Sequence, residues 1–145
     1  MTKTVGDFWG GGNHNCMKKF NKKYEEIISK ESLLVAWQNF LIGKKQKPDV
    51  VLFQNHLVAN IISIFNDLKT KTYTHGGYVA FNISDPKPRN IHKAIVCDRV
   101  LHHLLYKELY PYFDKKFIYD SYSCRVNKGT HKASLRFEKF ARKSF

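Results

Sequence analysis

The chain has 145 residues, of which 43% are hydrophobic, and a formal net charge of +13. This length and apolar share allow one packed domain or a piece of a larger one, and the charge favours a polyanionic partner such as nucleic acid. No apolar run approaches the roughly 18–20 residues of a membrane span, and no secretory signal opens the chain. The three cysteines, Cys16, Cys97 and Cys124, are scattered and odd in number, which argues against a disulfide framework. We therefore expect a cytoplasmic protein whose partner is nucleic acid rather than a membrane.

The first sixteen residues differ in composition from the rest. They contain Gly10-Gly11-Gly12 and show no helical periodicity, so residues 1–16 are expected to form a disordered extension. The glycine run lacks the following Gly-Lys-Ser/Thr of a phosphate-binding loop. Met17 opens a basic helical pattern and is an alternative start of the chain.

Two helical patterns follow. The first covers residues 18–42 with a predicted break near 29–32, and Gly43 and Pro48 mark its end. Its expected buried residues are Leu33, Trp37, Phe40 and Leu41. The second covers residues 51–68 as a single helix. Its expected stripe is Phe53, Leu57, Ile61, Phe65 and Leu68.

At Tyr78 the period changes to alternation, which predicts a strand over 78–84 and a second strand over 89–94. Two prolines in the intervening DPKPRN stiffen the turn, and they flank Lys87 with Arg89 next to it. A stiff basic tip suits a triphosphate or a phosphodiester, because Lys supplies a point charge and Arg can bind bidentately. The alternative, which the segment by itself favours, is an ordinary solvated turn.

Beyond the hairpin the pattern predicts a helix over 97–110 that Pro111 ends, an extended segment over 117–125 and a last helix over 131–144. The expected buried face of the first of these helices is Val96, Val100, Leu101, Leu104, Leu105 and Leu109. The last helix has two stripes. The apolar one is Ala133, Phe137, Phe140 and Ala141, and the basic one is Lys132, Arg136, Lys139 and Lys143.

Basic residues gather where the last helix begins. They are Arg125, Lys128, His131 and Lys132, and they surround Gly129-Thr130. The free N–H groups of a helix start attract anions, which predicts a phosphate-binding turn. The alternative is that the Thr130 hydroxyl caps the helix. Tyr119 and Tyr122 lie beside this turn, where a ring can stack on a base or simply pack.

No metal or catalytic motif stands out. His102 and His103 are neighbours, so on a helix they point about 100° apart and do not share an ion easily. Neither a Cys-x-x-Cys pair nor a His-Glu-x-x-His pattern is present. Cys124 and His131 lack a third orienting group. We therefore assign no catalytic and no metal-binding residue to this sequence.

Taken in order, GGYVAFNISDPKPRNIHKAIVCDRVLHHLLYKELYPYFDKKFIYDSYSCRVNKGTHKA resembles the N-terminal fingers of bacterial reverse transcriptases of the group II intron and diversity-generating retroelement kind. The most specific parts are DPKPRNIH, CDRVLHHLL and IYDSYSCRVNKGTHKA. The resemblance implies an α+β fold in which N-terminal helices precede a basic β-hairpin and then a helix, an extended segment and a helix. It implies that residues 17–145 are a partial reverse transcriptase domain.

The resemblance also implies partners and roles. In that family the basic hairpin, here with Lys87 and Arg89, meets the incoming dNTP triphosphate. The Asp-Arg pair that opens the next helix is matched by Asp98 and Arg99, where Arg99 has a structural or template-strand role. The family's second block, which lies near the RNA template and the RNA/DNA hybrid, is matched by Tyr122, Arg125, Lys128, Gly129, Thr130, His131, Lys132 and Ala133.

The chain departs from the family at its catalytic carboxylates. The family holds two Mg²⁺ ions on palm aspartates that follow these blocks, and this sequence has no Asp-Asp pair. We therefore expect a truncated reverse transcriptase that does not polymerise alone, binds no cofactor itself, and can self-associate through its palm-facing surface. The alternatives are an autonomous basic RNA-binding module and a small hydrolase that uses His131 or Cys124.

Overall fold

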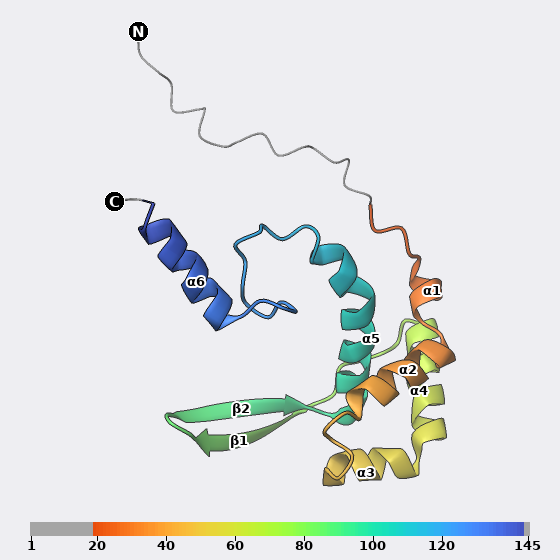
Figure 1. Cartoon of the computed structure of the whole chain (residues 1–145). Helices are drawn as coiled ribbons and strands as arrows, with labels where there is room; N and C mark the ends of the chain where they lie inside the picture. Colours follow the sequence, from red (N-terminus) through yellow and green to blue (C-terminus); the bar gives the residue numbers. More distant parts are fainter. Residues whose placement is uncertain (1–18, 144–145) are drawn as a thin grey trace.

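A computed structural model describes residues 19–143, and Figure 1 shows their arrangement. Their order is α1 (Tyr24–Ile27), α2 (Lys30–Phe40), α3 (Pro48–Asn55), α4 (Leu57–Lys69), β1 (Tyr78–Ser84), β2 (Pro88–Ala94), α5 (Val96–Phe113) and α6 (Thr130–Ala141). The fold is α+β, as expected, with one two-stranded antiparallel sheet among the described residues. The predicted extension over 1–16 lies outside the described residues.

The hydrophobic core lies among α2, α3, α4 and the first half of α5. The closest helix packing is between α2 and α5. The core residues are Ile28, Leu33, Ala36, Trp37, Phe40, Val50, Phe53, Ile61, Ile64, Leu68, Val96, Val100 and Leu104. None of the described residues from 105 to 143 is buried, so this part of the chain is supported by surface contacts rather than by this core.

The first predicted helix is shorter than expected and is divided where expected. Residues 19–23 are not helical, and α1 ends before Ser29. The side chain of Ser29 accepts a hydrogen bond of 3.0 Å from the backbone N–H of Ser32 and so caps α2. Beyond α2, Gly43 has a φ of +70°, a conformation that favours glycine. The start at residue 18 was therefore wrong, and the break near 29–32 is confirmed.

The single helix predicted over 51–68 was wrong, because α3 and α4 are separate helices that meet at His56. The backbone of His56 has φ −119° and ψ 30°, which is not helical. Asn60 Nδ2 donates to the carbonyl of Phe53 at 3.0 Å and satisfies an acceptor freed by the break. The apolar stripe keeps helical spacing across His56, with Phe53 and Ile61 both buried, and so the sequence pattern hides the break.

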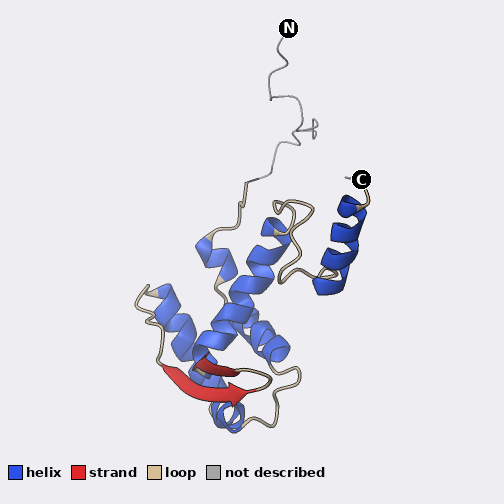
Figure 2. Ribbon diagram, turned by 90° about the vertical axis from the view of Figure 1, so that its left-hand side faces the viewer, coloured by secondary structure: helices blue, strands red, loops and turns tan. Residues whose placement is uncertain are grey.

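Both strands of the predicted hairpin are confirmed, although β2 begins one residue earlier, at Pro88. The register runs from Tyr78 opposite Ala94 to Ser84 opposite Pro88, which leaves residues 85–87 as the connection. The hairpin projects from the helical core in Figure 1 and faces the viewer in Figure 2, and all of β1 is exposed. It therefore meets solvent, or a partner, along most of its length.

α5 continues to Phe113, so the expectation that Pro111 ends this helix was wrong. Pro111 lies in the last turn, where its missing N–H leaves only the carbonyl of the exposed Lys107 without its helical donor. The burial of Val100 and Leu104 is confirmed, whereas Leu105 is exposed. Because the core ends near Leu104, the last turns of α5 have no neighbour that would cover Leu105.

The extended segment predicted over 117–125 was also wrong. Residues 114–129 form a series of turns, and Cys124 and Asn127 take left-handed φ values of +54° and +58°. The turns return the chain to α6, which has no buried residue. Among residues 19–143, no helix has the length and apolar character needed to cross a bilayer.

Candidate nucleic-acid interface

The hairpin tip presents Lys87 and Arg89 to solvent. Both residues are exposed, and neither side chain forms a hydrogen bond, an ion pair or a ring contact within residues 19–143. An arginine without an internal acceptor keeps all its guanidinium donors for a ligand. The tip therefore has two neighbouring cations that are both available to a ligand.

A carboxylate on α3 fixes the base of the hairpin to the core. Asp49 Oδ2 accepts from Lys93 Nζ of β2 at 3.0 Å and also from Arg99 Nη2 of α5. The Arg99 guanidinium lies 5.1 Å from the centre of the Phe40 ring. Burial alone would raise the pKa of Asp49, but the hydrogen bonds from Lys93 and Arg99 outweigh burial, and the pKa lies below its usual range. Arg99 thus takes part in an internal ion pair, which matches a structural role.

A second carboxylate, Asp98, fixes the segment that enters β1. Asp98 is buried and accepts from Tyr73 Oη at 2.5 Å and from the backbone N–H of Gly76 at 3.1 Å. A Cβ on Gly76 would lie 2.3 Å from Ile95 Cδ1, so the close approach requires glycine unless Ile95 moves. Burial, followed by the hydrogen bond to Asp98, raises the pKa of Tyr73. Asp49 and Asp98 together hold both strands of the hairpin at their bases.

Arg125 organises the loop that joins α5 to α6. Its Nε donates to Asp114 Oδ1 at 2.8 Å, its Nη2 donates to the Asp114 carbonyl at 3.0 Å, and its Nη1 donates to the carbonyls of Ile118 and Ser121 at 3.1 and 3.3 Å. Its guanidinium also lies 5.5 Å from the centre of the Phe117 ring. The hydrogen bonds from Arg125 hold the pKa of Asp114 below its usual range. As placed, this guanidinium shapes the loop and has little surface left for a ligand.

Two further cations lie on the tyrosines of this loop. Lys128 Nζ is 4.5 Å from the centre of the Tyr119 ring and 4.9 Å from that of Tyr122, and it donates to the Tyr119 carbonyl. Arg136 of α6 lies 5.2 Å from the Tyr119 ring and pairs with Asp120 at 2.8 Å. The hydrogen bond from Arg136 lowers the pKa of Asp120. Two cations therefore already lie over the Tyr119 ring, and a nucleobase that stacks on this ring has to displace one of them.

The start of α6 is more open. Gly129 precedes the helix with a φ of +122°, a conformation that favours glycine. Thr130 is the first helical residue, and no side chain caps the helix, so the alternative in which Thr130 acts as the cap does not apply. Lys132 Nζ donates to the Asn127 carbonyl at 2.6 Å. His131 is exposed and has no hydrogen bond within the described residues.

The predicted site residues thus form two groups. Residues 119–132 form one loop at the start of α6, whereas Lys87 and Arg89 lie at the hairpin tip. Both groups lie on the same side of α5 in Figure 1. Arg99 belongs to neither group, because it faces Asp49 at the core.

The sequence pattern did not reveal the carboxylates that hold these cations, Asp49, Asp114 and Asp120, or the contacts of Asp98. Asp49 and Arg99 are 50 positions apart in the sequence, and no spacing rule predicts a pair of acidic and basic side chains at such a separation. Asp98 carries only a weak signal, since an acid in the first turn of a helix is commonly explained by the helix dipole. The pairing of Arg125 with Asp114 depends on the turns between them, which the sequence pattern did not predict.

The two histidines of α5 lie against other aromatic rings. No group of three His, Cys, Asp or Glu side chains within residues 19–143 is placed to hold a metal ion. His103 packs edge-on against Phe40 at 5.5 Å, and burial lowers its pKa. His102 stacks on His75. Both histidines therefore have packing roles in α5.

Comparison with known proteins adds no assignment. No protein-family model matches this chain, and no curated protein matches it either. The function is therefore argued from the residues and their geometry.

Proposed function

We propose that the chain forms the fingers part of a reverse transcriptase, in which the hairpin binds the phosphates of the incoming dNTP and the loop over 119–132 faces the RNA template. The order of helices, basic hairpin, helix, loop and helix supports this proposal. The net charge of +13 supports a polyanionic ligand.

The observation that carries the proposal is the contrast between the hairpin tip and three paired arginines elsewhere in the predicted site and its surroundings. Arg99, Arg125 and Arg136 are each paired with an aspartate. Lys87 and Arg89 have no internal partner, yet the strands that carry them are fixed at their base by Asp49 and Asp98. A fixed backbone that carries two unpaired cations favours anion binding, because little backbone entropy is lost when the anion binds.

The loop contributes in a different way. Arg125 gives the loop its shape through four hydrogen bonds, while His131 and the backbone N–H groups at the start of α6 remain open to a phosphate. In this proposal Tyr122, Lys128 and Lys132 line the template side, and Arg125 acts on the template chiefly by holding them. The packing of Lys128 on Tyr119 and Tyr122 favours a mixed cationic and aromatic surface of the kind that binds single strands.

Nucleotide transfer itself is not assigned to this chain. The reaction requires Mg²⁺ held by neighbouring carboxylates. Arginine side chains instead pair with Asp49, Asp114 and Asp120, and the Tyr73 hydroxyl donates to Asp98. The described residues therefore do not fit a two-metal site. DNA synthesis is expected only from a protein that also contains the palm aspartates.

The proposal is tested by replacing both tip cations, Lys87→Ala with Arg89→Ala. The matched control is Lys45→Ala with Lys47→Ala, which removes the same charge from two exposed lysines near the start of α3. Calorimetry with a dNTP and fluorescence anisotropy with labelled single-stranded RNA give the two affinities. Loss of two charge-assisted contacts should weaken dNTP binding roughly 10-fold or more, and weaken RNA binding much less. Equal dNTP affinity in the hairpin and control variants, or a loss confined to RNA, would contradict the hairpin assignment.

A second candidate function is an autonomous RNA-binding module. The observation that favours it is the core, because α1 to α5 bury their apolar residues among themselves without α6. Both functions predict RNA affinity that falls steeply with salt, since bound cations release counterions from the phosphates. The two functions differ in the expected dNTP affinity. An RNA-binding module binds a dNTP only through general charge attraction, so the hairpin variant and the control variant should then have equal dNTP affinities.

A further inference from the structure

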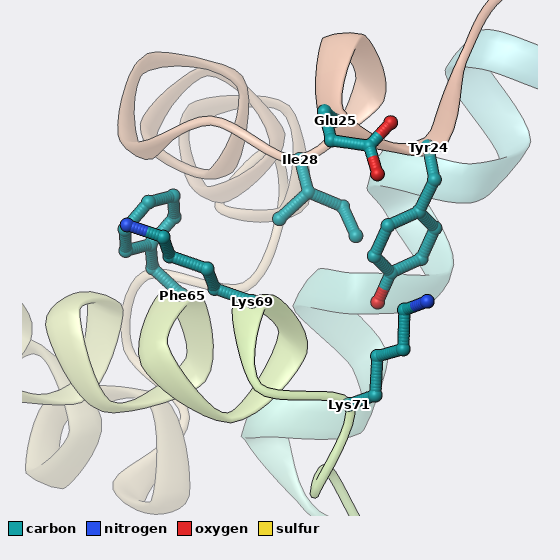
Figure 3. Close-up of a pocket in the computed structure, with 6 residues that line it drawn as sticks. All are labelled: Tyr24, Glu25, Ile28, Phe65, Lys69 and Lys71. Atoms are coloured by element: carbon teal, nitrogen blue, oxygen red, sulfur yellow. The ribbon is translucent and has the colours of Figure 1, made fainter.

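A pocket of about 250 Å³ lies between α1 and the end of α4, away from the hairpin and from the loop over 119–132. Figure 3 shows the side chains that line it: Tyr24, Glu25, Ile28, Phe65, Lys69 and Lys71. Its volume is enough for one flat ring and too small for most drug-sized ligands. Neither the hairpin nor the loop uses any of these residues.

The floor of the pocket is apolar and its aromatic wall is held in place. Ile28 is buried at the centre and points between Phe65 and Tyr24. The hydroxyl of Tyr24 donates to the carbonyl of Leu68 at 2.9 Å, which fixes the orientation of the ring. A ring held in this way binds a second flat ring with little loss of its own freedom, as aromatic residues do when they stack on unpaired bases.

The rim of the pocket carries charges of both signs. The Glu25 carboxylate lies at one side, and Lys69 and Lys71 rise from the α4 side (Figure 3). Within residues 19–143 neither Glu25 nor Lys71 has a side-chain hydrogen bond or an ion pair. Lys71 has a φ of +59°, the left-handed conformation that commonly follows a helix end, and from there its ammonium reaches the rim.

Lys69 and Lys30 lie over the Phe65 ring, at 5.9 and 5.3 Å from its centre, and add to the positive side. The pocket thus combines a stacking ring, one carboxylate acceptor and two lysines, with Lys30 beside it on Phe65. A purely apolar ligand would leave the carboxylate and Lys71 without partners. A nucleotide satisfies all three features, because its base is flat, an exocyclic amine can donate to a carboxylate, and its phosphate pairs with lysine.

We propose that this pocket receives one unpaired nucleotide of single-stranded RNA. The base stacks on Tyr24 beside Ile28, its exocyclic amine donates to Glu25, and its phosphate meets Lys71, which lies at the Tyr24 end of the pocket (Figure 3). That the ligand is RNA rests on the proposed function. That the pocket prefers a nucleobase with an exocyclic amine rests on the pocket alone. The site is a second contact for the strand, separate from the hairpin tip.

Two octanucleotides of equal charge and weak self-stacking, r(C)8 and r(U)8, test the proposal by fluorescence anisotropy. At its 4-position cytosine offers an exocyclic amine to Glu25, whereas uracil has a carbonyl oxygen there that the carboxylate repels. The unaltered chain should bind r(C)8 roughly 5- to 20-fold more tightly than r(U)8, as one hydrogen bond to a charged group allows. Glu25→Met should bring this ratio close to one. Tyr24→Leu should weaken both oligonucleotides, and Lys71→Gln should do so without changing the ratio.

The control Glu138→Met makes the same change of charge on the exposed face of α6 and should leave the ratio unchanged. A ratio near one in the unaltered chain, or a ratio that Glu25→Met leaves unchanged, would overturn the proposal. CMP that binds as tightly as r(C)8 would also overturn it and would identify a free-nucleotide site instead. The hairpin variant Lys87→Ala with Arg89→Ala keeps the cytosine preference if the pocket is correct, whether or not the hairpin binds a triphosphate, so the two proposals fail separately.

Discussion

Asp98 is the only buried charged residue among those described, and it connects α5 to the segment before β1. The Tyr73 hydroxyl and the Gly76 N–H both donate to it. A buried carboxylate is tolerated when such donors replace its lost hydration, and its position in the first turn of α5 adds the favourable field of the helix N-terminus. One residue thus determines how the hairpin leaves the helical core.

We predict that Asp98→Ala destabilises the protein by about 3 kcal/mol, because the Tyr73 hydroxyl and the Gly76 N–H both lose a charged acceptor. Tyr73→Phe removes one donor and should cost about half as much. Urea unfolding followed by circular dichroism measures both changes. An Asp98→Ala cost no larger than that of Tyr73→Phe would mean that Gly76 gains nothing from the carboxylate.

A pH dependence follows from the same contact. Burial and the hydrogen bond to Asp98 raise the pKa of Tyr73 in the folded chain, while an unfolded tyrosine titrates near pH 10. The stability from this contact is therefore complete below about pH 10 and is lost at higher pH, because the unfolded state then releases the proton more readily. The difference between the urea midpoints of the unaltered chain and of Tyr73→Phe should become smaller from pH 8 to pH 10 and pH 11. A constant difference between them would contradict the assignment.

At the scale of elements, the loop over 114–129 and helix α6 depend on polar contacts rather than on the core. Arg125 supplies most of these contacts within the loop, and Arg136 joins α6 to it through Asp120. The Tyr110 hydroxyl accepts from the backbone N–H of Val126 at 2.8 Å and ties the loop to α5. Such a segment is expected to open locally at a lower free energy than the helical core.

We predict that Arg125→Ala loosens this loop while the core remains folded. Amide hydrogen exchange at Val126 and Lys128 should become faster, and exchange in α2 should not change. Arg125→Lys keeps the charge but not the planar fork, so it should loosen the loop nearly as much and lose most of the RNA affinity that Arg125→Ala loses. Full RNA affinity in Arg125→Lys would instead show that the charge of Arg125 contacts the template directly.

At the scale of the whole molecule, the core lies at one end and apolar side chains remain uncovered at the other. Helix α6 exposes Leu135, Phe137 and Phe140, and the loop beside it exposes Ile118. Phe137 and Phe140, from the apolar stripe of the last helix, are thus exposed, whereas Leu104 of α5 is buried. Uncovered apolar surface of this kind is typical of a face that packs against another domain or another copy.

We predict that the chain self-associates through α6 and that Phe137→Ser reduces this association. Phe137 is 73% exposed, so its removal should change the free energy of unfolding by less than about 0.5 kcal/mol. Ile42→Ser is the matched control, because Ile42 is equally exposed, at 73%, but lies beyond the end of α2. Sedimentation velocity over a range of concentrations measures the association. Equal behaviour of the two variants would exclude α6 as the contact surface.

The sequence by itself determined the elements whose patterns are local. Alternation predicted the strands of the hairpin, and the apolar stripes identified Leu33, Phe40 and Val100 as core residues, because burial on one face leaves a period in the sequence. It also identified the hairpin cations as candidates. It did not find the break at His56, since the apolar stripe stays in phase across it.

Only the tertiary structure decided which cations are available. Arg99, Arg125 and Lys87 are alike in the sequence as basic residues near turns or helix ends. In the fold, Asp49 and Asp114 approach the two arginines through contacts between distant or irregular segments, while nothing approaches Lys87. The pocket at Tyr24 likewise depends on α1 meeting the end of α4, 44 positions away. Pairing across space leaves no periodic trace in the chain, which is why the sequence predicts the helices and strands better than it predicts the site.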